Sequence, residues 1–327
     1  MAPLVFVLFG PTASGKTALL ERLFDSCTFP AKNIPAEIIS ADSMQVYRGM
    51  DIGTAKPPPE ERARLPHHLI DIRNPDEQFN AGEFVRLAEE ACLAIRSRGA
   101  LPVVSGGTGF YLKNLVLGLP EAPPSGAELR RVLKEELALR GAVSLMEELA
   151  KADPVSAGRI HINDEYRLLR ALEVYRLTGR PLSSYASPWS TETAPGAGKF
   201  RFLLAGLRRN REDLYRRVNE RTAAMFRAGL PEEVRRLYEA GYTPSDPGLR
   251  AIGYREFFVE DPGGVWRLSE DMAGVEALIA QNSRRYAKRQ ITFFASLPDV
   301  KWIDCGEDND EAAREIRHLL DAELAEG

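Results

Sequence analysis

The chain has 327 residues, of which 44% are hydrophobic and 28% are charged, a composition typical of a globular protein with one large or two modest domains. Its 43 basic and 47 acidic residues give a formal net charge of −4, so any nucleic-acid contact must come from local basic patches. Three widely spaced cysteines form no metal or disulfide pattern, no apolar run approaches transmembrane length, and the N-terminus lacks signal-peptide features. We therefore expect a cytoplasmic enzyme that does not bind membranes.

The first predicted elements are a buried strand over Leu4–Phe9 and a helix over Thr17–Phe24, joined by the octapeptide GPTASGKT. The octapeptide fits the phosphate-binding pattern G-x-x-x-x-G-K-[ST]. Its fixed positions are occupied by Gly10, Gly15, Lys16 and Thr17. In such a loop, backbone N–H groups, a helix N-terminus and the lysine surround an anion, and the threonine hydroxyl suits Mg²⁺. An accidental glycine-rich turn is the alternative, but the flanking elements favour a di- or triphosphate site.

The next predicted elements alternate between strand and helix. A short strand over Glu37–Ser40 is followed by a break at Pro57–Pro59, a helix over Phe84–Arg98 and a strand over Leu101–Val104. Alternation of this kind predicts an α/β fold in which helices cover a parallel sheet.

The pattern then changes to helices alone. After a break over Glu121–Gly126, amphipathic spacing predicts helices over Glu128–Leu139 and Asp164–Leu177, with no strand between them. Residues 183–198 are rich in Ser, Pro, Gly and Thr and predict a loop or hinge. We therefore expect residues 121–195 to form a mainly helical insertion domain.

Strand character returns at Phe202–Leu207 and Val300–Ile303, with helices between them. We expect these strands to complete the first sheet, so that residues 1–120 and 196–327 form one catalytic core.

Three groups follow the first three strands, and the carboxyl ends of parallel strands meet at one crevice. They are the phosphate loop, Asp42, and the turn Gly106–Gly109 that contains Thr108. Asp42 could hold Mg²⁺ through water, cap a helix or act as a base, and the shared crevice favours a functional role. The long apolar run ending in Asp that marks a generic ATPase is present only in short versions, at Ile38–Asp42 and Leu69–Asp71.

Two arginines occupy the predicted buried face of a later helix. Arg217 and Arg221 share the helical spacing of Leu214, Val218 and Met225. Buried arginines need anionic partners, which could be internal salt bridges to Asp213 or Glu220. The alternative is that they reach a diphosphate, for which the planar guanidinium is well suited.

Two basic clusters are candidates for phosphodiester contacts in this net-acidic chain. One is Tyr166–Arg170 in the predicted insertion and the other is Arg284–Gln290. Each cluster could instead be a solvated helix face.

Seven blocks together resemble the tRNA dimethylallyltransferases, in that family's order and spacing over essentially the whole chain. The block over residues 40–57 is far more specific than the phosphate loop. The blocks are GPTASGKT, SADSMQVYRGMDIGTAKP, PHHLID, GGTGFYLKNL, HINDEYRLLRALEVY, RAIGYREF and RRYAKRQIT.

The resemblance implies a P-loop NTPase-like fold and a prenyltransferase of bacterial type, because the zinc-finger extension of eukaryotic relatives is missing. It implies transfer of a dimethylallyl group from dimethylallyl diphosphate to N6 of the adenine 3′ of the anticodon in tRNA. Asp42 would be the general base, with Thr108 and Arg217 also catalytic, and Mg²⁺ would bind at Thr17. The diphosphate would bind to Gly10, Thr12, Ala13, Ser14, Gly15, Lys16, Thr17, Arg217 and Arg221.

The resemblance also implies contacts with the anticodon stem-loop. The implied tRNA-binding residues are Asp42, Ser43, Met44, Gln45, Thr108, Arg130, Tyr166, Arg167, Leu168, Leu169, Arg170, Arg250, Arg255, Arg285, Lys288 and Arg289. The chain departs from the family where Ile162 replaces a common Pro, and where Phe293 and Ala295 replace a common Trp and Arg. The missing arginine puts one backbone contact in doubt, not the chemistry.

Three other functions are compatible with parts of the sequence. An adenylate isopentenyltransferase would modify free nucleotides, but the predicted insertion counts against it. A small-molecule kinase would use the phosphate loop for ATP, and a non-enzymatic RNA-binding protein would have no use for Lys16, Thr17 and Asp42 together. We expect the protein to be a monomer.

Overall fold

The computed structural model describes residues 2–24, 35–119, 122–123, 126–185, 199–306 and 309–325. It divides into two compact units, Met1–Val116 with Gly198–Gly327 and Leu117–Ala197. The predicted boundaries, after residues 120 and 195, lie four and two residues from these limits. Most of the predicted hinge over 183–198 lies outside the described residues.

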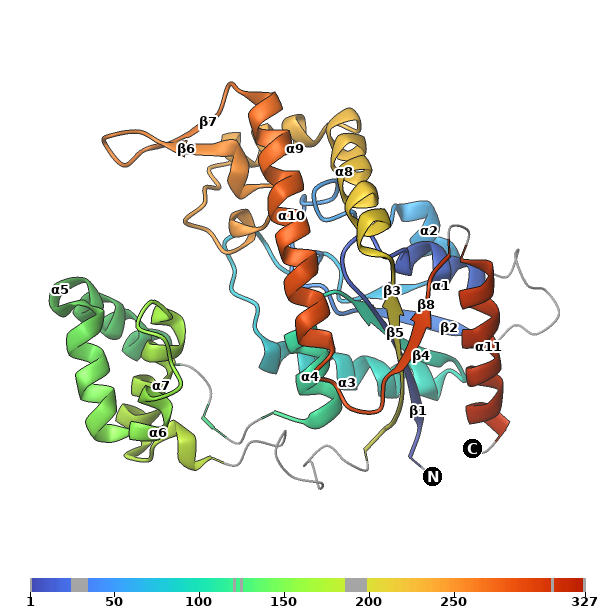
Figure 1. The fold of residues 1–327 in the computed structure, drawn as a ribbon, viewed down its shortest axis with the longest axis horizontal. Helices are drawn as coiled ribbons and strands as arrows, with labels where there is room; N and C mark the ends of the chain where they lie inside the picture. The colour runs from blue at the N-terminus through green and yellow to red at the C-terminus, as the bar shows by residue number, and fades with distance from the viewer. Residues whose placement is uncertain are drawn as a thin grey trace. The chain divides into compact units, whose positions relative to one another are not determined.

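A six-stranded sheet forms the centre of the first unit (Figure 1). Its order is β3-β2-β4-β1-β5-β8, and every neighbouring pair is parallel. The strands are β1 (Leu4–Phe9), β2 (Ala36–Ser40), β3 (His67–His68), β4 (Leu101–Gly106), β5 (Arg201–Arg208) and β8 (Lys301–Asp304). The predicted parallel sheet is therefore confirmed, and the late strands extend it as expected.

Strand β1 is buried along its whole length because helices cover both faces of the sheet. Leu4, Phe6 and Leu8 point into one core layer, with α1 (Lys16–Phe24) and α11 (Asp310–Ala325). The alternate residues point into a second layer, with α3 (Ala81–Ser97) and α4 (Gly109–Leu117). The period of two along the strand thus builds a three-layer α/β arrangement.

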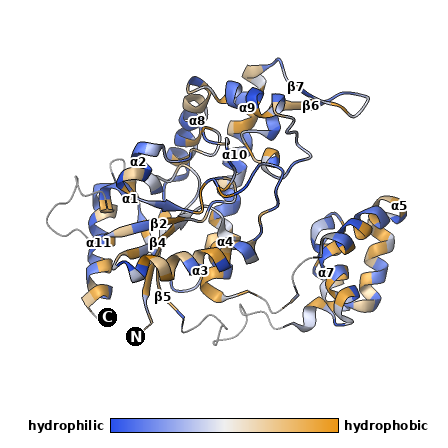
Figure 2. Ribbon diagram, turned by 180° about the vertical axis from the view of Figure 1, so that it is seen from behind, coloured by the Kyte–Doolittle hydropathy of each residue, from blue (hydrophilic) through white to orange (hydrophobic). Residues whose placement is uncertain are grey.

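A third hydrophobic cluster supports the irregular segment that follows β2. Val46, Tyr47 and Met50 of that segment pack with residues from helices late in the chain. The remaining elements of this unit are α2 (Pro59–Arg64), α8 (Arg211–Arg227), α9 (Leu230–Glu239), η2 (Gly248–Arg250), η3 (Arg255–Phe257), β6 (Phe258–Glu260), β7 (Trp266–Leu268) and α10 (Met272–Phe294). Hydrophobic and hydrophilic residues alternate along the long helices, as expected for helices with one buried face (Figure 2).

The second unit is helical in its described part and has its own core. It contains α5 (Ala127–Ala152), α6 (Pro154–Ala157), α7 (Glu165–Thr178) and η1 (Leu182–Ser184). Its core is formed by leucines of α5 and α7 such as Leu133, Leu149 and Leu172. The helix predicted to end at Leu139 continues, after a non-helical residue at Gly141, to Ala152. In the part of the chain that the structure describes, no helix is long and apolar enough to span a membrane.

Candidate active site

The phosphate loop connects β1 to α1 and wraps around the Lys16 side chain. The Lys16 Nζ donates to the carbonyl oxygens of Gly10 at 3.0 Å and Pro11 at 3.1 Å. Ala13 (φ 63°) and Gly15 (φ 98°) adopt left-handed backbone conformations that allow the tight wrap. Burial, followed by the nearby charge of Arg221, lowers the pKa of Lys16 to about 8, while Asp42 acts in the opposite direction.

Arg217 and Arg221 both reach the phosphate loop from α8. The Arg217 Nε donates to the Ala13 carbonyl oxygen at 3.1 Å, and Arg221 donates to the Thr12 hydroxyl at 2.9 Å. The alternative of internal salt bridges to Asp213 or Glu220 is wrong, because these carboxylates pair with Arg209 and Arg216 instead. Burial lowers the pKa of Arg221. Arg221 is a half-buried cation that pairs with no carboxylate of the described residues, which favours a site for an anion.

Arg209 is a third arginine at this loop, and sequence reasoning missed it. Its buried side chain donates to the Ser14 carbonyl oxygen at 3.0 Å and to Asn309 at 2.6 Å, and it pairs with Asp213 at 2.9 Å. The available signal was its place directly after β5, at the carboxyl edge of the parallel sheet. Arg209 thereby holds the phosphate loop in place through the Ser14 carbonyl oxygen.

Asp42 follows β2 and faces the phosphate loop. Its Oδ1 accepts hydrogen bonds from the backbone N–H groups of Met44 at 2.8 Å and Gln45 at 3.3 Å. Asp42 also lines a pocket together with Lys16 and Thr17. The interpretation of Asp42 as a helix cap is wrong, because the residues that follow it form a turn and the next helix, α2, begins at Pro59. The carboxylate holds this turn and also lines the pocket.

The turn after β4 is hydrogen-bonded to the loop that contains Asp42. The Ser43 N–H donates to the Thr108 Oγ1 at 3.0 Å, and the Thr108 N–H donates to the Ala41 carbonyl oxygen at 3.1 Å. A Cβ atom on Gly106 would lie 2.1 Å from that same carbonyl oxygen, so only glycine permits this approach. The crevice predicted from the strand ends thus exists, with the phosphate loop, Asp42 and Thr108 on its edges.

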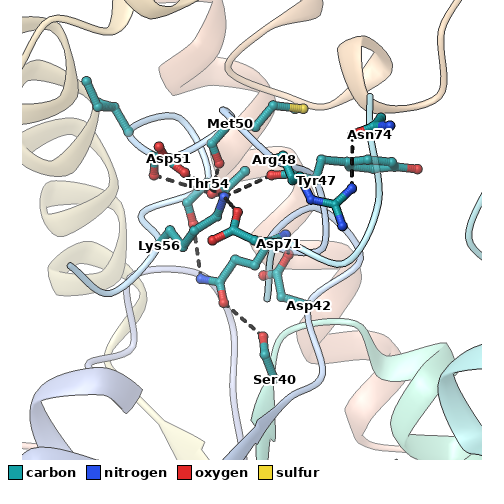
Figure 3. A network of polar contacts seen from close by, with 12 residues as sticks. Ser40, Asp42, Tyr47, Arg48, Met50, Asp51, Thr54, Lys56, Asp71 and Asn74 are labelled. Atoms are coloured by element: carbon teal, nitrogen blue, oxygen red, sulfur yellow. Dashed lines mark hydrogen bonds and ion pairs between the residues drawn. The ribbon is translucent and has the colours of Figure 1, made fainter. Parts of the chain in front are cut away.

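A buried lysine organises the segment between Asp42 and α2 (Figure 3). The Lys56 side chain is 2% exposed, and its Nζ donates to the Tyr47 carbonyl oxygen at 2.8 Å and to Asp51 and Asp71 at 2.6 Å each. Next to it, the Gln45 carboxamide accepts from Ser40 at 2.8 Å and donates to two backbone carbonyl oxygens at 3.3 Å. The orientation of Gln45 at the pocket therefore depends on the segment that Lys56 holds together.

We expect Lys56→Met to destabilise the protein by roughly 2–4 kcal/mol, because it leaves Asp71 and the Tyr47 carbonyl oxygen without their buried donor. Chemical unfolding of the full chain measures this value. Lys301→Met is the matched control, since Lys301 is exposed on β8 and should change stability little. Equal stability of the two variants would contradict the organising role of Lys56.

The basic residues predicted on the insertion divide into two groups. Arg130 and Arg170 both pair with the buried Glu173 of α7, at 3.4 and 2.9 Å. Tyr166 is 73% exposed as a whole residue. The Arg167 side chain is 72% exposed, so both residues are accessible to a ligand. Arg130 stacks on the Tyr166 ring at 4.7 Å, which links the two groups.

The prediction that Leu168 and Leu169 contact tRNA is wrong for their side chains. Both leucines are buried in the core of the helical unit. The helical period places them on the inner face of α7, opposite the exposed Arg167.

The basic residues predicted on the core unit lie on its surface. Arg285, Lys288 and Arg289 are exposed along α10. Arg255 stacks on the Trp266 ring at 4.3 Å, and Arg250 donates to the Pro244 carbonyl oxygen at 3.2 Å. These positions suit phosphate contacts, which stay predictions.

Comparison with known proteins identifies the family. A family model described as IPP transferase matches residues 45–297. The tRNA dimethylallyltransferase of Geobacter sulfurreducens is 44% identical over 298 residues, covering 91% of each chain. That of Geobacillus kaustophilus is 44% identical over 315 residues, covering 96% of this chain and 94% of the relative. The chain belongs to the IPP transferase family.

Solved structures of IPP transferases share the fold. A full-length tRNA isopentenylpyrophosphate transferase from Bacillus halodurans is 34% identical, with a TM-score of 0.65 over 100% of this chain and 98% of that one. A eukaryotic dimethylallyltransferase acting on tRNA is 26% identical, with a TM-score of 0.77 over 99% of this chain and 80% of that one. The P-loop NTPase-like fold expected from the resemblance is confirmed.

The donor atoms of this IPP transferase fit a Mg²⁺ ion that a diphosphate helps to hold. The Thr17 hydroxyl lines the pocket and offers a hard oxygen atom. The described residues contain no group of three or more His, Cys, Asp or Glu side chains that could enclose a metal. Mg²⁺ commonly keeps several waters and binds through one or two protein oxygens plus phosphates, so this small donor set suits it.

Proposed function

We propose that this IPP transferase moves a dimethylallyl group from dimethylallyl diphosphate to N6 of the adenine 3′ of the anticodon in tRNA and releases diphosphate. The observation that carries the proposal is the convergence of Lys16, Arg221 and Asp42 at one phosphate loop. A loop with two half-buried cations suits the donor's diphosphate, and a carboxylate beside it suits an acceptor that must lose a proton.

The donor's diphosphate would lie in the phosphate loop, against the backbone N–H groups of residues 13 and 15–17, because those of Thr12 and Ser14 already donate to Gln290 and Pro11. Lys16, Arg217 and Arg221 would neutralise the charge that develops as the carbon–oxygen bond breaks. Mg²⁺ at Thr17 would act as a Lewis acid on the leaving diphosphate. Because the side chains of Lys16, Arg217 and Arg221 already lie at the loop, little reorganisation of these cations is needed when the bond breaks.

Asp42 would act as the general base. The lone pair of the adenine N6 forms a bond to C1 of the dimethylallyl group while the electrons of the C1–O bond leave with diphosphate. The proton of the amine then passes to the Asp42 carboxylate, whose Oδ1 is already held by Met44 and Gln45. Thr108, fixed to Ser43 at 3.0 Å, would place the donor and the acceptor next to each other.

The target adenine must leave its stack in the anticodon loop to reach the crevice, which costs a few kcal/mol. We propose that exposed side chains on α7 and α10 recover this cost by binding the RNA. Tyr166 can stack on a base, while Arg167, Arg285, Lys288 and Arg289 can contact phosphates.

We further propose that the protein works as a monomer in the cytoplasm, where its tRNA substrate is present.

The test is a two-substrate assay with Mg²⁺ and labelled dimethylallyl diphosphate. Unmodified tRNA and AMP are offered separately as acceptors. We expect label to enter tRNA and not AMP. Label in AMP alone would favour an adenylate isopentenyltransferase. ATP is added in a parallel reaction, and its hydrolysis without any label transfer in the main assay would favour a kinase.

A further inference from the structure

The Gln290 side chain joins the two loops at the edge of the crevice. Its Oε1 accepts a hydrogen bond from the Thr12 N–H of the phosphate loop at 2.8 Å. Its Nε2 donates to the Gly107 carbonyl oxygen of the turn after β4 at 2.7 Å. Gln290 is only 5% exposed, so water cannot readily replace either bond.

The surroundings of Gln290 are built for this bridge. A Cβ atom on Gly107 would lie 2.5 Å from the Gln290 Nε2, so the glycine provides the space that the carboxamide fills. The next residue of the turn, Thr108, accepts a hydrogen bond from the Ser43 N–H at 3.0 Å, so Gln290 and Ser43 hold adjacent residues of the turn. Gln290 therefore connects the phosphate loop to the turn that contains Thr108.

The bridge matches a geometric requirement of the transfer. The phosphate loop would hold the donor, and the turn containing Thr108 would hold the acceptor side of the crevice. A direct displacement needs the two reacting atoms within about 3–3.5 Å and aligned, and small errors of placement are costly. The backbones of β1 and β4 pair as far as Phe9 and Gly106. Beyond these strand ends, the Gln290 carboxamide continues the connection to Thr12 and Gly107.

We propose that Gln290 is a positioning residue that keeps the phosphate loop and the Gly106–Gly109 turn in register for prenyl transfer. This inference rests on the proposed function for its kinetic consequence, but the bridge itself can be tested without catalysis. Gln290 acts through Thr12 and Gly107 and does not touch the reacting atoms.

The test uses the full-length chain with Gln290→Met and Gln290→Glu. Methionine has nearly the same length and removes both bonds, whereas glutamate keeps the acceptor for the Thr12 N–H and loses the donor to Gly107. Gln281→Met is the matched control, because Gln281 is exposed on the same helix. Hydrogen exchange of residues 9–16, the affinity for inorganic diphosphate with Mg²⁺, and kcat and KM for tRNA prenylation are measured.

For Gln290→Met we expect faster exchange at Thr12, diphosphate affinity lowered about tenfold and kcat lowered about 10²-fold, with KM for tRNA little changed. For Gln290→Glu we expect Thr12 exchange close to that of the wild type, but weaker diphosphate binding because a carboxylate now faces the loop. Gln281→Met should match the wild type in every measurement.

Wild-type exchange at Thr12 together with wild-type kcat in folded Gln290→Met would overturn the inference. So would a loss of kcat in Gln290→Met that is fully explained by a smaller folded fraction. If the wild type transfers no prenyl group, the proposed function fails. The exchange and diphosphate measurements would then still decide whether Gln290 holds the loop.

Discussion

Asp42→Asn is expected to lower the rate of prenyl transfer to tRNA about 10²- to 10⁴-fold, the range over which a positioned general base contributes. Asparagine keeps the carbonyl oxygen that accepts from the Met44 and Gln45 N–H groups, so the turn should survive. It cannot take the proton that the adenine amine must lose. Single-turnover measurements with saturating donor and tRNA report the chemical step directly.

The same variant should bind inorganic diphosphate about as well as the wild type, because Lys16 and Arg221 still provide the cationic site. Asp76→Asn serves as the control, since Asp76 is exposed and outside the pocket. A single-turnover rate for Asp42→Asn within about threefold of the wild-type rate would rule out Asp42 as the base.

The sequence predicted the parts of the site that depend on short-range patterns. The phosphate loop, Asp42 and the turn with Thr108 each follow directly after a strand, and parallel strand ends meet at one edge. The sequence also predicted that Arg217 and Arg221 lie on the buried face of their helix, because they share the helical spacing of Leu214 and Val218. It left open whether their partner is a carboxylate or a diphosphate.

The contacts that hold these parts in place could not be predicted, because they join distant segments. Gln290 bonds to Thr12 across 278 positions, and Arg209 bonds to Ser14 across 195. Glu233 of α9 accepts from the backbone N–H groups of Asp51 and Ile52, more than 180 positions away. Nothing in local periodicity reveals such pairs, since they arise only when α8, α9 and α10 pack beside the loops.

The contiguous motif over residues 166–170 gave a partly wrong prediction for a related reason. A motif matched along the sequence assigns one role to consecutive residues, but an α-helix turns by about 100° at each one. Tyr166 and Arg167 therefore face solvent, whereas Leu168 and Leu169 face the core of the helical unit.

The second large effect is expected in the pH dependence of diphosphate binding. The pKa of Lys16 in the free protein is about 8, lowered first by burial and then by Arg221. The protonated lysine attracts the anion and the neutral amine does not. Affinity should therefore be level below about pH 8 and fall as pH rises above it, by at most about tenfold per pH unit for one proton.

Comparison with the Lys16→Met variant separates the ionisation of Lys16 from the ionisation of diphosphate itself. The variant keeps the ligand and the other cations but has no group at position 16 that can ionise. We expect its affinity to be lower than the wild-type affinity by about 10²-fold or more near pH 7, because a buried charge pair with the anion is lost. Calorimetric titrations from about pH 6.5 to about pH 9.5 should show the two affinities converging as the wild-type lysine loses its proton.

Proton uptake provides an independent measurement of the same effect. A bound diphosphate must raise the pKa of Lys16, because an anion in contact favours the charged ammonium. Between the free and bound pKa values, binding therefore takes up a proton that the free protein lacks. Titrations in two buffers with different ionisation enthalpies should reveal this uptake near pH 8 or above in the wild type, in excess of that in Lys16→Met. Equal uptake by both proteins would show that Lys16 is already fully protonated before the diphosphate binds, and the depressed pKa would then play no part in donor binding.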